Sequence, residues 1–274
     1  MRRNVARHLL ALAGALFALV PLLVASHAPG VLRVCSDPNN LPFSDSAGRG
    51  FENRIAELLA RDLGDRVEYT WWAQRRGFAR HTLLAGQCDV IMGMPAGADP
   101  LRTTRPYYSS SYVFVYPRSR GWHIRSFSDT ALRHLRIGVH LIGDDFNSLP
   151  PAVALARRGL AGHVVGYSIY GNYAESSPPA RLIDAVAQGD VDIAAAWGPL
   201  AGYFAQREPV PLEVVPVATD PADGPAARFV YSIAIAVRPA DSVLQSRLQT
   251  ALDRHHAAIE QILRSYGVPL VSAR

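Results

Sequence analysis

The feature that most constrains the fold is an alternation of short apolar strands with amphipathic helices, which occurs twice along the chain. In the first half the segments are a strand at 31–35, a helix at 52–63, a strand at 67–72, a helix at 78–85 and a strand at 88–92. The second half has a strand at 135–141, a helix at 150–158, a strand at 163–170, a helix at 178–189 and a strand at 191–196. GQCDV at 86–90 and GDVDI at 189–193 stand at the same helix-to-strand junction in each half. This alternation predicts parallel sheets covered by helices, in an α/β fold of two lobes.

Two long extended runs, 107–116 and 228–239, lie outside the alternation. We expect them to form two β crossings that join the lobes and act as a hinge. The last helix follows Asp241, carries apolar side chains at helical spacing and ends at Gly267, so it should pack back on the first lobe. The predicted lobes are a discontinuous first lobe of residues 29–109 and 229–274 and a second lobe of residues 110–228.

Residues 1–28 have the pattern of a secretory signal peptide: a basic start, an apolar run from Leu9 to Val24, and small residues up to Ala28. We expect cleavage after Ala28 and a periplasmic location. A retained membrane anchor is the alternative, but the apolar run is short and contains Pro21, and no second such run follows. The mature chain is expected to have no membrane-bound part.

The charge of the chain excludes several functions. The formal net charge of +5 includes three arginines of the signal segment, and no basic stripe remains to indicate nucleic-acid binding. All 28 basic residues are arginine, because the sequence contains no lysine. Schiff-base chemistry and a phosphate-binding loop of the Walker type, which both need lysine, are therefore excluded.

The two cysteines, Cys35 and Cys88, leave their pairing open. Export permits a disulfide. However, Cys35 ends one predicted strand and Cys88 begins another, so in parallel neighbouring strands they would lie at opposite ends, beyond the roughly 7 Å that a bridge allows between Cα atoms. The residues therefore favour two free thiols. Neither cysteine has metal-ligand spacing around it, so no metal site is expected.

Seven strings in order carry a resemblance to a known family. They are CSDPNNLPFS at 35–44, YTWWAQRRGF at 69–78, GMPAG at 93–97, TTRPYY at 103–108, IGDD at 142–145, PPAR at 178–181 and WGPLAGYF at 197–204. Together with the two lobes, they resemble periplasmic solute-binding proteins of the amino-acid-binding (type II) group. Within that group the strings are similar to the MxaJ/XoxJ proteins associated with quinoprotein methanol dehydrogenases. The resemblance covers nearly all of the mature chain.

The polar loop after the first strand is the expected wall of a binding cleft. In an open parallel sheet, ligands bind beyond the carboxyl ends of the strands, so Asp37, Asn39 and Asn40 should face the cleft. Pro38 and Pro42 restrict the backbone and would lower the ordering cost of binding. A stiff polar turn that binds nothing is the alternative.

When the ligand-binding residues of amino-acid receptors are matched to this chain one by one, the resemblance implies that three of these features are missing. The arginine that usually grips the ligand carboxylate falls on Gly97. The carboxylate that usually holds the ligand ammonium falls on Trp197. Where such receptors present Ser-Gly-Thr-Thr to an anion, this chain has Asp144 and Asp145, which repel one and are suited to capping a helix. Amino-acid binding is therefore not expected.

The candidate cleft residues are instead mainly aromatic and acidic. They are Asp37, Asn39, Asn40, Phe43, Trp71, Trp72, Pro95, Tyr107, His140, Asp144, Asp145 and Trp197. Because adjacent strand residues face opposite ways, at most one of Trp71 and Trp72 should reach the cleft. A small neutral or cationic ligand fits this chemistry, and a cleft plugged by its own Trp and Tyr side chains is the alternative.

No catalytic motif accompanies these residues: the sequence has no nucleophile elbow, no HExxH, and no glycine-rich nucleotide loop. We therefore expect neither enzymatic activity nor a cofactor. The resemblance implies an accessory protein of a PQQ-dependent methanol or alcohol dehydrogenase, lanthanide-dependent enzymes included, that binds the dehydrogenase or assists its maturation. The alternative is a solute receptor that closes on a small molecule other than an amino acid and delivers it to an ABC importer.

Overall fold

The computed structural model describes residues 30–141, 149–169, 176–223 and 228–272. The predicted signal peptide, Asp144 and Asp145 lie outside the described residues. Within these ranges, no helix combines the length and the apolar character needed to cross a membrane.

The first lobe is built around parallel strands. Its elements are β1 (Gly30–Ser36), β2 (Asn39–Asn40), β3 (Ser44–Asp45), α1 (Phe51–Leu63), β4 (Asp65–Trp71), α2 (Phe78–His81), β5 (Ile91–Pro95) and β6 (Arg102–Thr103). Strands β1 and β4 pair in parallel over their whole length, and a parallel bridge from Val34 to Val90 places β1 beside the start of β5. The parallel arrangement expected from the sequence is confirmed.

Helix α1 follows the predicted pattern, because Phe51, Ile55 and Leu59 lie on one face and are fully buried. It ends at Gly64, whose φ of 76° is the left-handed conformation that glycine adopts without strain. The predicted helix at 78–85 is shorter than expected. Helix α2 stops at His81, where the Thr82 hydroxyl turns back to the Phe78 carbonyl, and turns lead on to Gly86.

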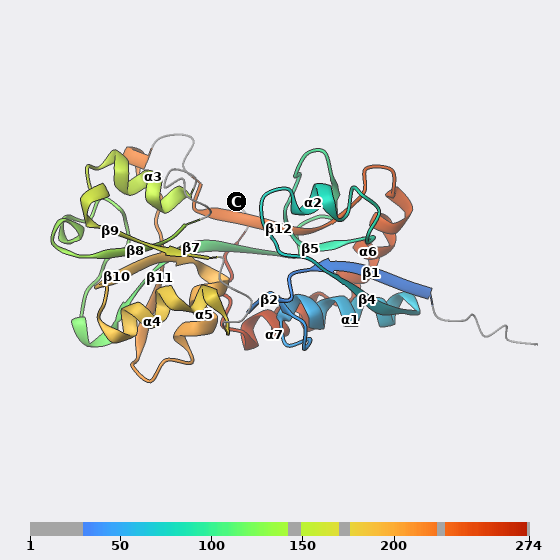
Figure 1. Cartoon of the computed structure of the whole chain (residues 1–274), viewed down its shortest axis with the longest axis horizontal. Coiled ribbons are helices and arrows are strands. Elements are labelled where there is room, and N and C mark those ends of the chain that lie inside the picture. Colours follow the sequence, from blue (N-terminus) through green and yellow to red (C-terminus); the bar gives the residue numbers. More distant parts are fainter. Residues whose placement is uncertain (1–29, 142–148, 170–175, 224–227, 273–274) are drawn as a thin grey trace, which may run out of the picture.

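The second lobe contains β8 to β11 and three helices. Its elements are β8 (Ile137–Leu141), α3 (Pro150–Arg157), β9 (Val164–Ser168), α4 (Arg181–Gln188), β10 (Ile193–Trp197), α5 (Gly198–Ala205) and β11 (Leu212–Pro216). Short 3-10 helices lie at Arg118–Arg120, Thr130–His134, Ala161–His163, Pro178–Ala180 and Pro221–Asp223. Strand β8 pairs in parallel with β9 and β10. In Figure 1, α3 lies above this part of the sheet and α4 and α5 lie below it.

Two long strands cross between the lobes, as predicted. They are β7 (Tyr108–Pro117) and β12 (Val230–Val237), which pair antiparallel with each other. Strand β12 also pairs with β5, and β7 also pairs with β10 and β11. One eight-stranded sheet therefore contains strands of both lobes, and in it β7 runs through the middle of the molecule (Figure 1). In the first lobe, β1 with β4 and β2 with β3 form separate two-stranded sheets. The exact lobe boundaries stay a prediction.

The C-terminal segment returns to the first lobe, as expected, but as two helices. Helices α6 (Ser242–Arg254) and α7 (His256–Ser265) are separated at His255, and both contact α1. The His255 ring lies 2.8 Å from an oxygen of Asp62 at the end of α1. Beyond α7, the Val271 amide donates to the Ser109 carbonyl and ties the tail to β7.

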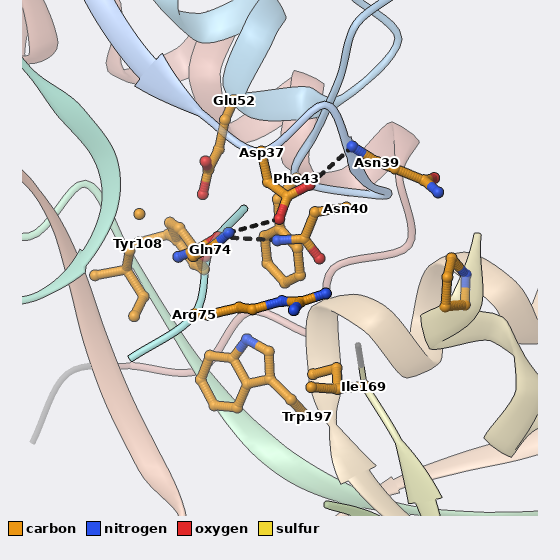
Figure 2. A pocket seen from close by; sticks show the side chains of 13 residues that line it. Asp37, Asn39, Asn40, Phe43, Glu52, Gln74, Arg75, Tyr108, Ile169 and Trp197 are labelled. Carbon is orange, nitrogen blue, oxygen red and sulfur yellow. Dashed lines mark hydrogen bonds between the residues drawn. The ribbon is translucent and has the colours of Figure 1, made fainter. Parts of the chain in front are cut away.

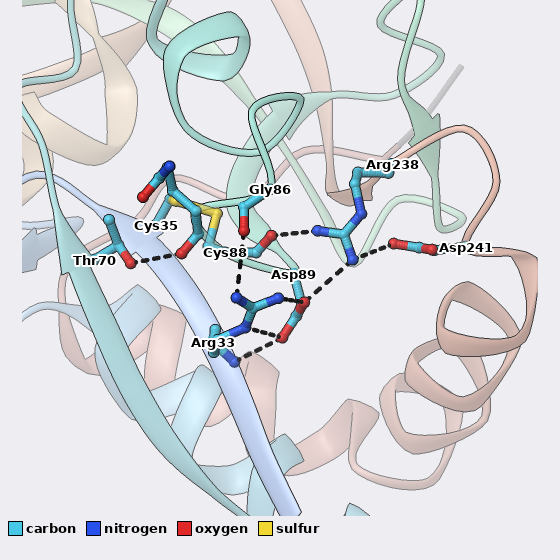
Figure 3. Close-up of polar contacts among 9 residues, drawn as sticks. Arg33, Cys35, Thr70, Gly86, Cys88, Asp89, Arg238 and Asp241 are labelled. Carbon is cyan, nitrogen blue, oxygen red and sulfur yellow. Dashed lines mark hydrogen bonds and ion pairs between the residues drawn. A yellow bond between two sulfur atoms is a disulfide. The ribbon is translucent and has the colours of Figure 1, made fainter.

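An arginine and an aspartate fasten the same junction in each lobe. Arg33 on β1 donates to the Asp89 carboxylate and to the Gly86 carbonyl (Figure 3). Arg136, before β8, makes the same pair of contacts with Asp192 and Gly189. The sequence separations are also the same, 56 residues to the aspartate and 53 to the glycine. The repeat noticed in the sequence is therefore structural.

Cys35 and Cys88 form a disulfide, so the expectation of two free thiols is wrong. Their Cα atoms lie 5.6 Å apart. Strands β1 and β5 are parallel neighbours as assumed, but Cys88 does not belong to β5. The chain bends at Asp89, and hydrogen bonds from the Asp89 and Val90 amides to the Arg33 carbonyl fold Cys88 back beside Cys35 (Figure 3).

Replacing both cysteines with alanine should lower the free energy of unfolding by about 4 kcal/mol, because the bridge closes a loop of 53 residues in the unfolded chain. Urea unfolding of the double variant and the wild type measures the difference. Wild-type protein unfolded with a reductant is the control and should match the variant. A loss below about 1 kcal/mol would contradict the expectation.

Candidate functional site

A cavity of about 230 Å³ lies between the lobes. Its lining consists of Asp37, Asn39, Asn40, Phe43, Glu52, Gln74, Arg75, Gly93, Tyr108, Ile169, Pro178, Trp197 and Ile233. Figure 2 shows the polar side chains of the first lobe on one side and Trp197 and Ile169 of the second lobe on the other. Five of the candidate residues come together here: Asp37, Asn39, Asn40, Phe43 and Trp197.

The buried carboxylate of Asp37 organises the loop after β1. One of its oxygens accepts the Asn39 amide at 2.8 Å, and the other accepts the Gln74 amide at 2.7 Å. The Asn40 side-chain amide donates to Gln74 Oε1 at 2.9 Å (Figure 2). Two loops far apart in sequence are thereby fixed to each other, which limits the entropy lost when a ligand binds.

Glu52, in the first turn of α1, is a cavity residue that the sequence analysis missed. Its side chain points from the helix into the cavity (Figure 2), and only 8% of the residue is exposed. The start of a helix favours a negative charge, but burial dominates and raises the pKa of Glu52 to about 8. At neutral pH this carboxyl is therefore protonated, and its hydroxyl can donate a hydrogen bond.

The wall contributed by the second lobe is aromatic and apolar. Trp197 packs edge-on against Tyr112 and Tyr231, with ring centroids 5.4 and 5.8 Å apart. The Arg75 side chain lies between Asn40 and Trp197 and so crosses the space between the lobes (Figure 2). At the rim, the Ser177 amide contacts Asn39 Oδ1 at 3.4 Å. The side chain that narrows the cleft is thus an arginine, whereas the alternative from the sequence was a cleft filled by Trp and Tyr side chains.

The adjacent tryptophans do not line the cavity. Trp71 stacks on Tyr69 along β4, with centroids 4.5 Å apart. Trp72 is 49% exposed and stacks beside His81. The same segment reaches the cavity two and three residues later, through Gln74 and Arg75.

Three other candidates also lie outside the cavity lining. The Tyr107 hydroxyl donates to the Met92 carbonyl, and Pro95 ends β5 in an exposed position. His140 is buried, and its Nε2 donates to the Pro179 carbonyl at 3.2 Å. Burial lowers the pKa of His140 to about 4, so the ring is neutral at physiological pH and serves the packing of β8.

The two positions that the resemblance assigns to the charged groups of amino-acid receptors, Gly97 and Trp197, carry no charge. Gly97 lies in an exposed turn, and its φ is 74°. The nearby arginines are engaged elsewhere: Arg102 donates to the Pro239 carbonyl, and Arg105 pairs with Asp253. Trp197 lines the cavity, at the position that the resemblance aligned with the carboxylate that binds the ligand ammonium.

The chain is similar in sequence and in fold to several known proteins. No protein-family model matches the chain. The chain is 28% identical to Protein MoxJ of Methylorubrum extorquens over 291 residues, 98% of this chain and 97% of that protein. It is 32% identical to the crystal structure of the periplasmic binding protein XoxJ from Methylobacterium extorquens AM1, which superposes with a TM-score of 0.73 over 88% of this chain and all of that one.

The chain belongs to the MoxJ/MxaJ/XoxJ family of periplasmic binding proteins. MxaJ from Methlophaga aminisulfidivorans MPT is 29% identical, with a TM-score of 0.77 and coverage of 88% of this chain and 100% of that one. An ancestral cationic amino acid solute binding protein, at 20% identity and a TM-score of 0.66, shares the fold. The two-lobed type II fold expected from the sequence is confirmed.

The pH dependence of stability should reveal the buried Glu52. In the unfolded chain this carboxyl ionises near its ordinary pKa of 4.5, whereas the folded chain keeps the proton until about pH 8. Because the folded state binds more protons in that window, its free energy of unfolding falls with rising pH by up to about 1.4 kcal/mol per unit. Glu52→Gln removes this loss. Above pH 8 the free energy of unfolding of the variant should exceed that of the wild type by at least about 2 kcal/mol.

Urea unfolding at both ends of that window measures the effect. Glu57→Gln is the matched control, because Glu57 lies on the exposed face of the same helix. Its difference from the wild type should stay small and independent of pH. If the free energy of unfolding of Glu52→Gln and of the wild type changed with pH in the same way, this would contradict the raised pKa of Glu52.

Removing the Asp37 carboxylate should loosen both loops. Asp37→Ala leaves the Asn39 and Gln74 amides without their acceptor, at a cost of about 2–4 kcal/mol in the free energy of unfolding. Hydrogen exchange at these two amides should also become faster. Asp190→Ala, in an exposed turn after α4, is the control and should change neither quantity.

Proposed function

We propose that this chain is a periplasmic accessory protein of a PQQ-dependent methanol or alcohol dehydrogenase, and that it binds the dehydrogenase or assists its maturation. Its membership of a family of periplasmic binding proteins supports the location, and the MoxJ and XoxJ relatives support the link to the dehydrogenase. The observation that carries the proposal is the composition of the cleft. The chain has the fold of a receptor, but Gly97 lies in a turn and Trp197 lines the cavity at the two positions that the resemblance assigns to amino-acid binding.

Electrostatics explains why the loss of charged residues at positions 97 and 197 disfavours amino-acid binding. A zwitterionic amino acid enters a cleft only if both of its charges find partners there, because an unpaired buried charge is costly. In this cavity the Asp37 carboxylate already accepts two backbone amides, and Glu52 is neutral at physiological pH. Glu52 therefore offers a ligand ammonium no negative charge at physiological pH, and both oxygens of Asp37 already accept a backbone amide.

A solute receptor for an importer is the second candidate. The observation in its favour is the cavity between two lobes that β7 and β12 connect, since receptors of this architecture close on their solute by bending such strands. The two functions differ in what the protein binds.

Calorimetry of the mature protein against the apo and PQQ-loaded dehydrogenase tests the proposal. We expect binding to at least one of these forms and no heat with the common amino acids. A periplasmic amino-acid-binding protein of the same fold is the control and should show the reverse. Lack of association with either form, in the calorimeter and in a pull-down from periplasm, would remove the proposed function.

A further inference from the structure

The buried carboxyl of Glu52 points into the cavity without a hydrogen-bond partner. No donor or acceptor in the described part of the chain reaches it, although it lies 8% exposed at the cavity wall. The Glu52 oxygens are not among the fully enclosed unpaired atoms of the described residues, so they are open to the cavity and a molecule inside it can reach them. We propose that the cavity binds a small uncharged molecule, and that Glu52 donates a hydrogen bond to it.

The space around Glu52 is shaped for this side chain. Gly93 on β5 faces it so closely that a Cβ atom there would lie 2.1 Å from Glu52 Oε1. A larger residue at position 93 would displace the carboxyl, and α1 and β5 thus leave room for it at the end of the cavity. The carboxyl is held in place by packing, and its hydrogen-bonding capacity remains for a ligand.

The amide pair on the neighbouring loops adds further groups. Because Asn40 donates its side-chain N–H to Gln74 Oε1, Asn40 Oδ1 and Gln74 Nε2 are left without a partner among the described residues. Both residues line the cavity. With the Glu52 carboxyl, the wall offers donors and acceptors together, a combination that suits hydroxyl and amide groups.

The lining gives neither a cation nor an anion a net electrostatic advantage. Arg75 extends into the space between the lobes, and the Asp37 carboxylate in the same lining carries the opposite charge. These two charges balance each other, and Glu52 adds none while it is protonated. Phe43, Tyr108 and Trp197 contribute apolar surface. The volume of about 230 Å³ is below the range of about 300–1,000 Å³ typical of larger ligands.

The ligand class is therefore a short uncharged amide, alcohol or diol. Matched probes test it: propionamide, butyramide and propylene glycol, with propionate and propylammonium as charged counterparts of the same size. We expect at least one uncharged probe to bind the mature protein with a Kd below about 1 mM in calorimetry. The two charged counterparts should bind at least tenfold more weakly.

Variants of Glu52 separate hydrogen bonding from packing. Glu52→Leu fills the space without a donor and should weaken binding of the uncharged probe at least tenfold. Glu52→Gln keeps an N–H donor and should retain the affinity. Glu57→Gln, on the exposed face of α1, is the control and should leave the affinity unchanged.

The pH provides a second readout. The charged or titratable groups that face Glu52 are Asp37, Arg75, Tyr69, Tyr107 and Tyr108. Burial raises the pKa of all three tyrosines, to about 12 for Tyr69, so they stay neutral as Glu52 ionises. Wild-type affinity should fall above about pH 8, and Glu52→Gln should remove this dependence.

Stronger binding of propylammonium or propionate than of the uncharged probes would overturn the proposal, as would the absence of binding by every uncharged probe. Equal affinity of wild type and Glu52→Leu would also overturn the role of Glu52. The titrations contain no dehydrogenase, so their outcome is independent of the proposed association.

Discussion

The rest of the structure depends on the backbone hydrogen bonds of β7, because this strand belongs to both lobes. Its first half pairs with β12 and its second half with β10 and β11. Tyr112, in the middle of β7, lies opposite Trp197 in the pairing of β7 with β10. The indole that replaces a ligand-binding carboxylate is therefore packed against the crossing strands themselves. Any molecule that changes the position of Trp197 acts directly on the connection between the lobes.

The fold was predictable because its signals are local. Apolar periodicity, Gly64 and Gly189 define where helices end, and the repeated order of elements leaves few topologies. The Asp37 loop was predictable for the same reason, since a polar loop at the carboxyl end of a parallel strand has a fixed place in the fold. The predictions failed where contacts between segments far apart in the sequence determine the structure. The disulfide required knowledge of the bend at Asp89, which hydrogen bonds to Arg33 create.

The burial of Glu52 in the cavity wall likewise depends on a distant segment and could not be predicted from the sequence. In sequence, an acidic residue in the first turn of a helix is explained by the helix dipole, so nothing indicates burial. Its environment depends on Gly93, which lies 41 positions away and supplies the space. None of the seven strings that carry the resemblance contains Glu52. Trp72 and His140 show the opposite error, since a conspicuous side chain beside a cleft strand can face solvent or the core.

The junction that Arg33 and Asp89 fasten in the first lobe recurs at Arg136 and Asp192 in the second, but the covalent bridge does not. The positions that correspond to Cys35 and Cys88 are Gly138 and Val191, which pack without a bond between them. The junction in the first lobe is therefore cross-linked covalently next to the cavity, whereas the junction in the second lobe is held by the contacts of Arg136 and by packing. Under reducing conditions the first lobe loses this constraint on its unfolded chain, whereas the second lobe has no such bridge to lose.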